Sequence, residues 1–127
     1  NNIKFNEIDY KILAKRIAEF TQKNWEIARS ICSTFNIRPI FVLQPVYYVD
    51  FPIEKHLFLP PNENPFWQNI YREYYSNMRI KNENKRDFLD ASTILKNPKE
   101  CPYIDSHHYS PYGNQKIAEF IADKLKG

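Results

Sequence analysis

The segment Ile-Arg-Pro-Ile-Phe-Val-Leu-Gln, residues 37–44, constrains the fold of this chain more than any other. Its centre, Ile40 to Leu43, is a continuous apolar run that ends before Pro45. A short apolar run between a helical pattern and a proline is typical of a strand buried on both faces, as in a parallel sheet. Helices cover both faces of such a sheet, so the segment predicts an α/β layered fold.

Helical and extended patterns alternate along the rest of the chain. In chain order they predict a helix over residues 7–35, the strand, a helix over 66–80, a short strand over 87–92 and a helix over 111–126. Asn6 is the expected N-cap of the first helix, whose period weakens at residues 22–24, so two abutting helices are an alternative. Ser110 is the expected N-cap of the last helix, with Pro111 at its first position and Gly127 at its C-terminal cap.

Each terminal helix carries an apolar stripe that is expected to face the core. The stripe of the first helix comprises Ile8, Ile12, Leu13, Ile17, Phe20, Ile27, Ile31 and Phe35, and that of the last comprises Ile117, Ala118, Ile121 and Leu125. Residues 45–65 form a long loop rich in proline and aromatic residues, a composition that favours an ordered functional loop over disorder.

Composition excludes several classes of function. The chain has 2 glycines in 127 residues, so it holds no glycine-rich phosphate loop of a nucleotide-binding domain. The net charge of +3 is spread out, and without a run of Lys and Arg a solvated surface is favoured over a nucleic-acid interface. No apolar run is long enough to span a membrane. The two cysteines, Cys32 and Cys101, form no metal-binding or redox motif, and they could be bridged or free.

The residue types that suit acid–base catalysis are concentrated in residues 103–114, Tyr-Ile-Asp-Ser-His-His-Tyr-Ser-Pro-Tyr-Gly-Asn. Asp105 and His108 are three positions apart in a loop that enters the last helix. On a tight loop this spacing lets the carboxylate bond one ring nitrogen and stabilise the imidazolium, while the other nitrogen acts as general base. A turn with two surface histidines is the structural alternative.

The string Asp-x-x-His-x-Ser-Pro-x-Gly-Asn, beginning at Asp105, resembles the last motif block of the SGNH hydrolases, the GDSL-type esterases and lipases. Residues 41–45 and 87–92 also resemble strands of that family. The resemblance implies a three-layer α/β/α, flavodoxin-like fold with a mostly parallel sheet. It further implies that Asp105 and His108 are the catalytic acid and base.

The same resemblance implies that the nucleophile is not in this chain. The family's Gly-Asp-Ser-like motif is missing, and no serine of the chain follows a Gly-Asp pair. Residues 1–127 are therefore expected to form the C-terminal portion of one domain, completed by an N-terminal segment that carries the serine. The implied reaction is hydrolysis of acyl or acetyl esters, including carbohydrate esters, without a cofactor or a metal. Gln44, Tyr47 and Tyr109 are candidates for substrate contact, although packing explains Gln44 and Tyr47 at least as well and a tyrosine in the position of Tyr109 is more often a packing residue.

Three alternatives stay open at this point. Cys101, Asp105, His107 and His108 have side chains of the types that bind zinc. A fold that has lost its nucleophile could act as a carbohydrate- or protein-binding module. Some relatives transfer the acyl group to a sugar instead of water, and only the shape of the cleft decides between these acceptors.

Overall fold

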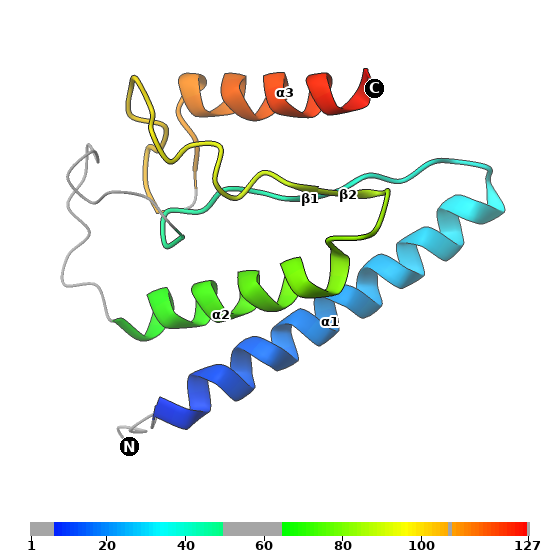
Figure 1. Ribbon diagram of the computed structural model, residues 1–127, viewed down its shortest axis with the longest axis horizontal. Helices are drawn as coiled ribbons and strands as arrows, with labels where there is room; N and C mark the ends of the chain where they lie inside the picture. Colours follow the sequence, from blue (N-terminus) through cyan, green and yellow to red (C-terminus); the bar gives the residue numbers. More distant parts are fainter. Residues whose placement is uncertain (1–6, 50–64, 107, 127) are drawn as a thin grey trace. The chain divides into compact units, whose positions relative to one another are not determined.

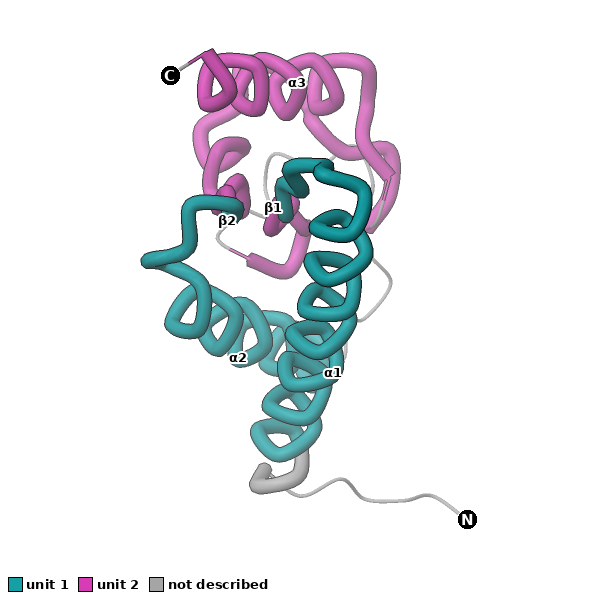
Figure 2. The backbone as a smooth tube through the Cα atoms, turned by 90° about the vertical axis from the view of Figure 1, so that its right-hand side faces the viewer, with its two compact units in different colours: residues 1–41, 64–88 teal, residues 42–63, 89–127 magenta. Residues whose placement is uncertain are grey.

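The computed structural model describes residues 7–49, 65–106 and 108–126. The described elements, in chain order, are α1 (Glu7–Thr34), β1 (Phe41–Leu43), α2 (Pro65–Asn82), β2 (Phe88–Asp90) and α3 (Pro111–Leu125) (Figure 1). The chain divides into two compact units (Figure 2). Unit 1 consists of residues 1–41 and 64–88, and unit 2 of residues 42–63 and 89–127.

Helix α1 is one continuous helix, so the alternative of a break at residues 22–24 is wrong. It ends at Thr34, and Asn36, two residues later, has a positive φ of 53°. The amide of Ile37 donates to the carbonyl of Cys32 at 2.8 Å, and the amide of Asn36 donates to that of Ser33 at 3.2 Å. This pair of bonds is a Schellman motif, in which asparagine takes the left-handed position that glycine usually occupies.

Unit 1 is built on the packing of α2 against α1, which lie side by side in Figures 1 and 2. The fully buried Ala14 and Ala18 of α1 let the helices approach closely, and Ile70 and Met78 of α2 are also buried. Further along α1, the ring of Trp25 stacks on Phe41 with centroids 4.8 Å apart. The start of β1 is thereby attached to the second half of α1.

Unit 2 has its own buried cluster around the ends of the strands. Its buried apolar residues are Leu43, Val46, Tyr47, Val49, Ala91, Leu95 and Tyr103. Helix α3 begins as the sequence predicts, because Ser110 is its N-cap and Pro111 its first residue. The predicted cap residues Asn6 and Gly127 lie outside the described residues, as does most of the predicted loop, residues 50–64.

The predicted three-layer α/β/α SGNH fold is wrong for this chain. The described residues contain a two-stranded sheet of three residues per strand and three helices. The amide of Phe41 donates to the carbonyl of Asp87, and the amide of Ala91 donates to that of Leu43, so the strands are parallel. Pro39 and Pro45 have no amide hydrogen to donate on either side of β1, which limits the strand to its apolar centre. Two short strands offer too little surface to separate two layers of helices.

The predicted buried stripes are wrong as well. The small Ala14 and Ala18 of α1 face the interior instead, and the exposed side chains of the predicted stripe are Ile12, Leu13, Ile17, Phe20, Ile27, Ile31 and Phe35. On α3, Ala118 and Leu125 are exposed while Ile117 and Ile121 are half-buried. The apolar period correctly identified each helix. It did not identify which face of the helix is covered by the rest of the described chain. No helix among the described residues is both long and apolar enough to cross a membrane.

Candidate acid–base site

The loop that carries Asp105 and His108 closes at its base through backbone hydrogen bonds. Tyr103 and Tyr109 form an antiparallel bridge. Above it, the amide of Ile104 donates to the carbonyl of His108 at 2.8 Å, and below it the amide of Ser110 donates to the carbonyl of Pro102 at 2.9 Å. These bonds close a narrow loop, which carries Asp105 and His108, immediately before α3.

The carboxylate of Asp105 holds both the backbone and the ring of His108. Its Oδ1 accepts the His108 amide at 2.8 Å, and His108 Nδ1 lies 3.0 Å from Oδ1 and 2.8 Å from Oδ2. A carboxylate at Nδ1 favours the tautomer with the hydrogen on that nitrogen, which leaves a lone pair on Nε2. Among the described residues Nε2 has no hydrogen-bond partner, and the His108 side chain is 76% exposed. The geometry is therefore that of an oriented base open to solvent.

Ser110 connects this loop to α3 through both functions of its hydroxyl. The hydroxyl donates to the carbonyl of Cys101 at 2.7 Å and accepts the amide of Gly113 at 3.2 Å. It thus caps the helix and fixes the helix to the segment before the loop. Sequence reasoning identified the cap, but not the bond to Cys101, because only the folded loop brings the two residues together.

Gly113 lies on the same connection, in the first turn of α3. A Cβ at this position would stand 2.3 Å from the carbonyl oxygen of Pro102. The first turn of α3 therefore approaches the loop base more closely than any residue with a side chain would permit.

Tyr109 attaches the loop to the segment that follows β1. Its hydroxyl donates to the carbonyl of Pro45, which lies between two of the predicted substrate-contact residues, Gln44 and Tyr47. Burial raises the pKa of Tyr109 to about 12. Burial also raises the pKa of Tyr103, whose ring centroid is 5.5 Å from that of Tyr109. The buried Tyr103 and the half-buried Tyr109 thus support the loop that carries Asp105 and the exposed His108.

The structure places the three predicted substrate-contact residues differently. Gln44 is exposed, Tyr47 is buried with its ring edge against Tyr48 at 5.2 Å, and Tyr109 is half-buried in the contact with Pro45. All three belong to unit 2, as do Asp105 and His108. They stay predictions for substrate contact, with Gln44 the most accessible of them.

Two serines of unit 2 are engaged in structural hydrogen bonds. Ser110 is the helix cap, and Ser92 donates from its hydroxyl to Asp90 Oδ1 at 2.5 Å. The latter bond closes the turn after β2, which sequence reasoning did not foresee. Neither serine is bonded to His108.

The metal-site alternative depends partly on His107, which lies outside the described residues, as does His56. Among the side chains that the structure describes, no group of three or more His, Cys, Asp or Glu could hold a metal ion. Cys101 is a free thiol whose Sγ donates to the carbonyl of Tyr103 at 3.2 Å, and Cys32 is free as well.

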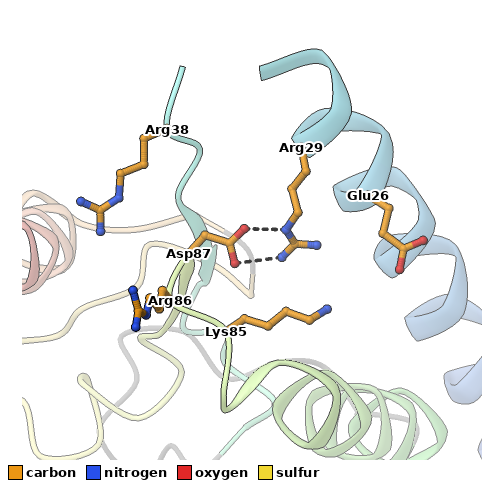
Figure 3. Close-up of a pocket in the computed structure, with 6 residues that line it drawn as sticks. All are labelled: Glu26, Arg29, Arg38, Lys85, Arg86 and Asp87. Carbon is orange, nitrogen blue, oxygen red and sulfur yellow. Dashed lines mark hydrogen bonds and ion pairs between the residues drawn. The ribbon is translucent and has the colours of Figure 1, made fainter. Parts of the chain in front are cut away.

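A second charged feature lies in unit 1, at the start of β2. An open depression of about 610 Å³ is lined by Glu26, Arg29, Arg38, Lys85, Arg86 and Asp87 (Figure 3). The guanidinium of Arg29 binds the Asp87 carboxylate through Nε at 2.5 Å and through Nη2 at 3.1 Å.

Two observations argue against an anion-binding site in this depression. The hydrogen bond from Arg29 lowers the pKa of Asp87. The same pairing occupies the Arg29 guanidinium, which is the cation nearest the centre of the depression. Lys85 extends towards α1, whereas Arg38 and Arg86 point away from it (Figure 3). The cations do not converge on one point, so the depression is a solvated surface around an ion pair.

Comparison with known protein families, with curated proteins and with solved structures found no match for this chain. The geometry of the loop and the motif from Asp105 to Asn114 are therefore the features that point to a function.

Proposed function

We propose that this chain supplies the acid–base pair of a serine-dependent ester hydrolase related to the SGNH family. In this proposal Asp105 orients His108, and the nucleophilic serine and the oxyanion donors come from a polypeptide segment other than residues 1–127. The single observation that carries the proposal is the contact of His108 Nδ1 with both oxygens of Asp105, at 3.0 and 2.8 Å. The string from Asp105 to Asn114 supports it independently, because it resembles the family's last motif block.

The exposure of the pair fits a site that is completed by another segment. General-base catalysis requires Nε2 to reach the nucleophile's hydroxyl, and no hydrogen bond within the described residues occupies this nitrogen. A solvent-open imidazole alone would provide little rate enhancement, since oxyanion stabilisation and exclusion of water contribute much of it. We therefore expect residues 1–127 to have no esterase activity by themselves.

In the proposed reaction Nε2 of His108 removes the proton from the serine hydroxyl as its oxygen attacks the ester carbonyl. The imidazolium that forms is stabilised by Asp105 and then protonates the leaving alcohol, giving an acyl-serine. Water attacks the acyl group with His108 again as base, and the carboxylic acid leaves as the serine regains its proton. The substrate class proposed is acyl or acetyl esters.

The experiment that tests the function uses a protein that carries residues 1–127 together with the proposed serine segment. His108→Ala is expected to abolish both hydrolysis of an acetyl ester and labelling by a fluorophosphonate probe, because the serine loses its base. His107→Ala is the matched control, since it removes the neighbouring imidazole, and it is expected to retain most of the activity.

Equal losses in the two variants would remove His108 from its proposed role. An adduct that forms normally in both variants would show that the serine reacts without this loop, and would favour a structural role for the Asp105–His108 turn. Acyl transfer to an added sugar in preference to water would identify the reaction as acyltransfer.

A further inference from the structure

Helix α1 presents a second apolar face that the described residues leave exposed. Leu13, Ile17, Phe20, Ile27 and Ile31 are all on this face. The buried Ala14 and Ala18 lie on the adjoining face. A contiguous apolar face that stays exposed marks an interaction site.

The exposed face follows a heptad repeat. With Ile17 at position a, the core positions a and d fall on Tyr10, Leu13, Ile17, Phe20, Asn24, Ile27, Ile31 and Thr34, and these eight residues are called the α1 seam here. The seam spans more than three heptads within one unbroken helix. Apolar heptads of this length are the pattern of a coiled coil.

Asn24 identifies the partner of the seam. It is the polar residue at a central position a, between Ile17 and Ile31 at the neighbouring a positions. Isoleucine at a with a single asparagine at a favours two-stranded, parallel coiled coils, because the two asparagines face and bond one another across the axis. We propose that the α1 seam pairs with the α1 seam of a second copy of this chain, in parallel and in register.

The charges beside the seam agree with the parallel arrangement. Positions g carry Arg16, Lys23 and Ser30, and the facing e positions of a parallel partner carry the uncharged Thr21, Ala28 and Phe35. In an antiparallel pair positions g face each other, and with the two seams aligned over their full length Lys23 would face Lys23 of the second copy. The charges at positions g therefore favour the parallel orientation over the antiparallel one.

The area of the seam is sufficient for a specific dimer. Five large apolar residues occupy positions a and d between Leu13 and Ile31, and Phe35 lies beside them. Each of these six residues is between 36 and 70% exposed. Since such side chains present about 150–250 Å² each, pairing buries roughly 600 Å² of apolar surface per copy. The total of about 1,200 Å² reaches the lower end of the range of specific interfaces, and the roughly 600 Å² on one copy lies at the upper end of the apolar patches found on monomers.

The first test is the mass of residues 1–127 in solution, by sedimentation equilibrium over a range of concentrations. The wild type is expected to approach twice 15.3 kDa. Ile27→Lys should shift the protein to the monomer mass by placing two ammonium groups in the seam. Ile12→Lys is the matched control, because Ile12 is also an exposed isoleucine of α1 but lies at position c. Asn24→Lys is expected to dissociate the dimer as well, and it replaces one exposed polar side chain by another.

Circular dichroism establishes that each variant keeps its helices. A mass of 15.3 kDa for the wild type at every concentration would overturn the proposal and leave the seam to a different polypeptide. Equal effects of Ile12→Lys and Ile27→Lys would overturn it too, because the pairing would then not use the seam.

A second measurement tests the orientation. Ile17→Cys, in a chain that also carries Cys32→Ser and Cys101→Ser, places a single thiol at a position a away from the middle of α1. A parallel in-register pair brings the two thiols together, so oxidation is expected to give a covalent dimer on a non-reducing gel. A dimer by mass that fails to cross-link would contradict the parallel register.

Discussion

At the scale of single residues, the tightest constraint in unit 2 is the approach of Gly113 to the Pro102 carbonyl. The helix begins so close to the loop base that one methyl group has no room between them. Ser110 bonds across the same junction, so the position of Asp105 and His108 relative to α3 depends on two small side chains. A methyl added at Gly113 or a hydroxyl lost at Ser110 would therefore act on the Asp105–His108 pair without touching it.

Gly113→Ala is expected to destabilise the chain by about 1–3 kcal/mol, because the added Cβ forces the helix and the Pro102 carbonyl apart. Alanine is the better helix former, so propensity alone predicts the opposite sign. The midpoint of urea unfolding measures the difference, with the exposed neighbour Asn114→Ala as control. A stabilised Gly113→Ala variant would mean that the junction yields easily.

Asp105→Asn is a test of the carboxylate rather than of the loop. Asparagine keeps an oxygen for the His108 amide, so the melting temperature is expected to stay close to that of the wild type. In the serine-bearing protein described above, turnover is expected to fall by up to about 10⁴-fold, because an amide neither selects the correct tautomer nor stabilises the imidazolium. Turnover near that of the wild type would remove Asp105 from the mechanism.

At the scale of elements, periodicity and capping residues predicted the described helices and strands within a few residues. Helix α3 starts where Ser110 and Pro111 indicate, and α1 runs through the weak period at residues 22–24 because the helix interior tolerates polar residues there. The contacts that connect elements were not predictable in this way. The pairing of Arg29 with Asp87 joins positions 58 apart in the chain, and no local pattern specifies such a pair.

The Arg29–Asp87 pair predicts how the attachment of α1 to β2 responds to acid. The hydrogen bond from Arg29 lowers the pKa of Asp87 from its ordinary value of 3.8. Its contribution to stability is therefore complete above pH 3.8 and is lost as the pH falls through the lowered pKa of the folded state. Asp87→Asn is expected to lower stability at neutral pH and to flatten this acid limb of the profile.

Urea midpoints measured from acid to neutral pH test the prediction. Asp123→Asn, which removes an exposed carboxylate of α3, is the control and is expected to leave the acid limb close to that of the wild type. If the stability of Asp87→Asn falls in acid as steeply as that of the wild type, other carboxylates are responsible for the acid unfolding.

At the scale of the whole molecule, the layered fold was the part of the structure that the sequence predicted wrongly. The residues that misled the prediction are the apolar ones at 40–43, since a run buried on both faces indicates a sheet but not how many strands it has. Two strands and three helices are what the described residues form. The apolar stripe of α1 predicts a core face, yet its side chains from Ile12 to Ile31 are exposed, because a period shows that a face is apolar and not which polypeptide covers it.

The long-range contact within unit 2 predicts the response to alkali. Burial raises the pKa of Tyr109 from 10.0 to about 12. The stability from its neutral hydroxyl is therefore complete below pH 10 and is lost as the pH rises towards 12. Tyr109→Phe removes the bond to Pro45, so we expect a loss of about 0.5–1.5 kcal/mol at neutral pH and a smaller decline in alkali. Urea midpoints between neutral and alkaline pH measure the loss and the decline, with Tyr112→Phe as control. A decline in alkali for Tyr109→Phe equal to that of the wild type would contradict the role given to the Tyr109 hydroxyl.

The closure of the Asp105–His108 loop through Tyr103 and Tyr109 has a consequence for the order of folding. The contacts that shape the pair join residues three to six positions apart, whereas the bond from Tyr109 to Pro45 joins residues 64 apart. The entropy lost on closing a loop grows with its length, so the short loop can form before the distant contact does. We therefore expect Asp105 and His108 to be oriented early, before the contact with Pro45 connects their loop to the segment after β1.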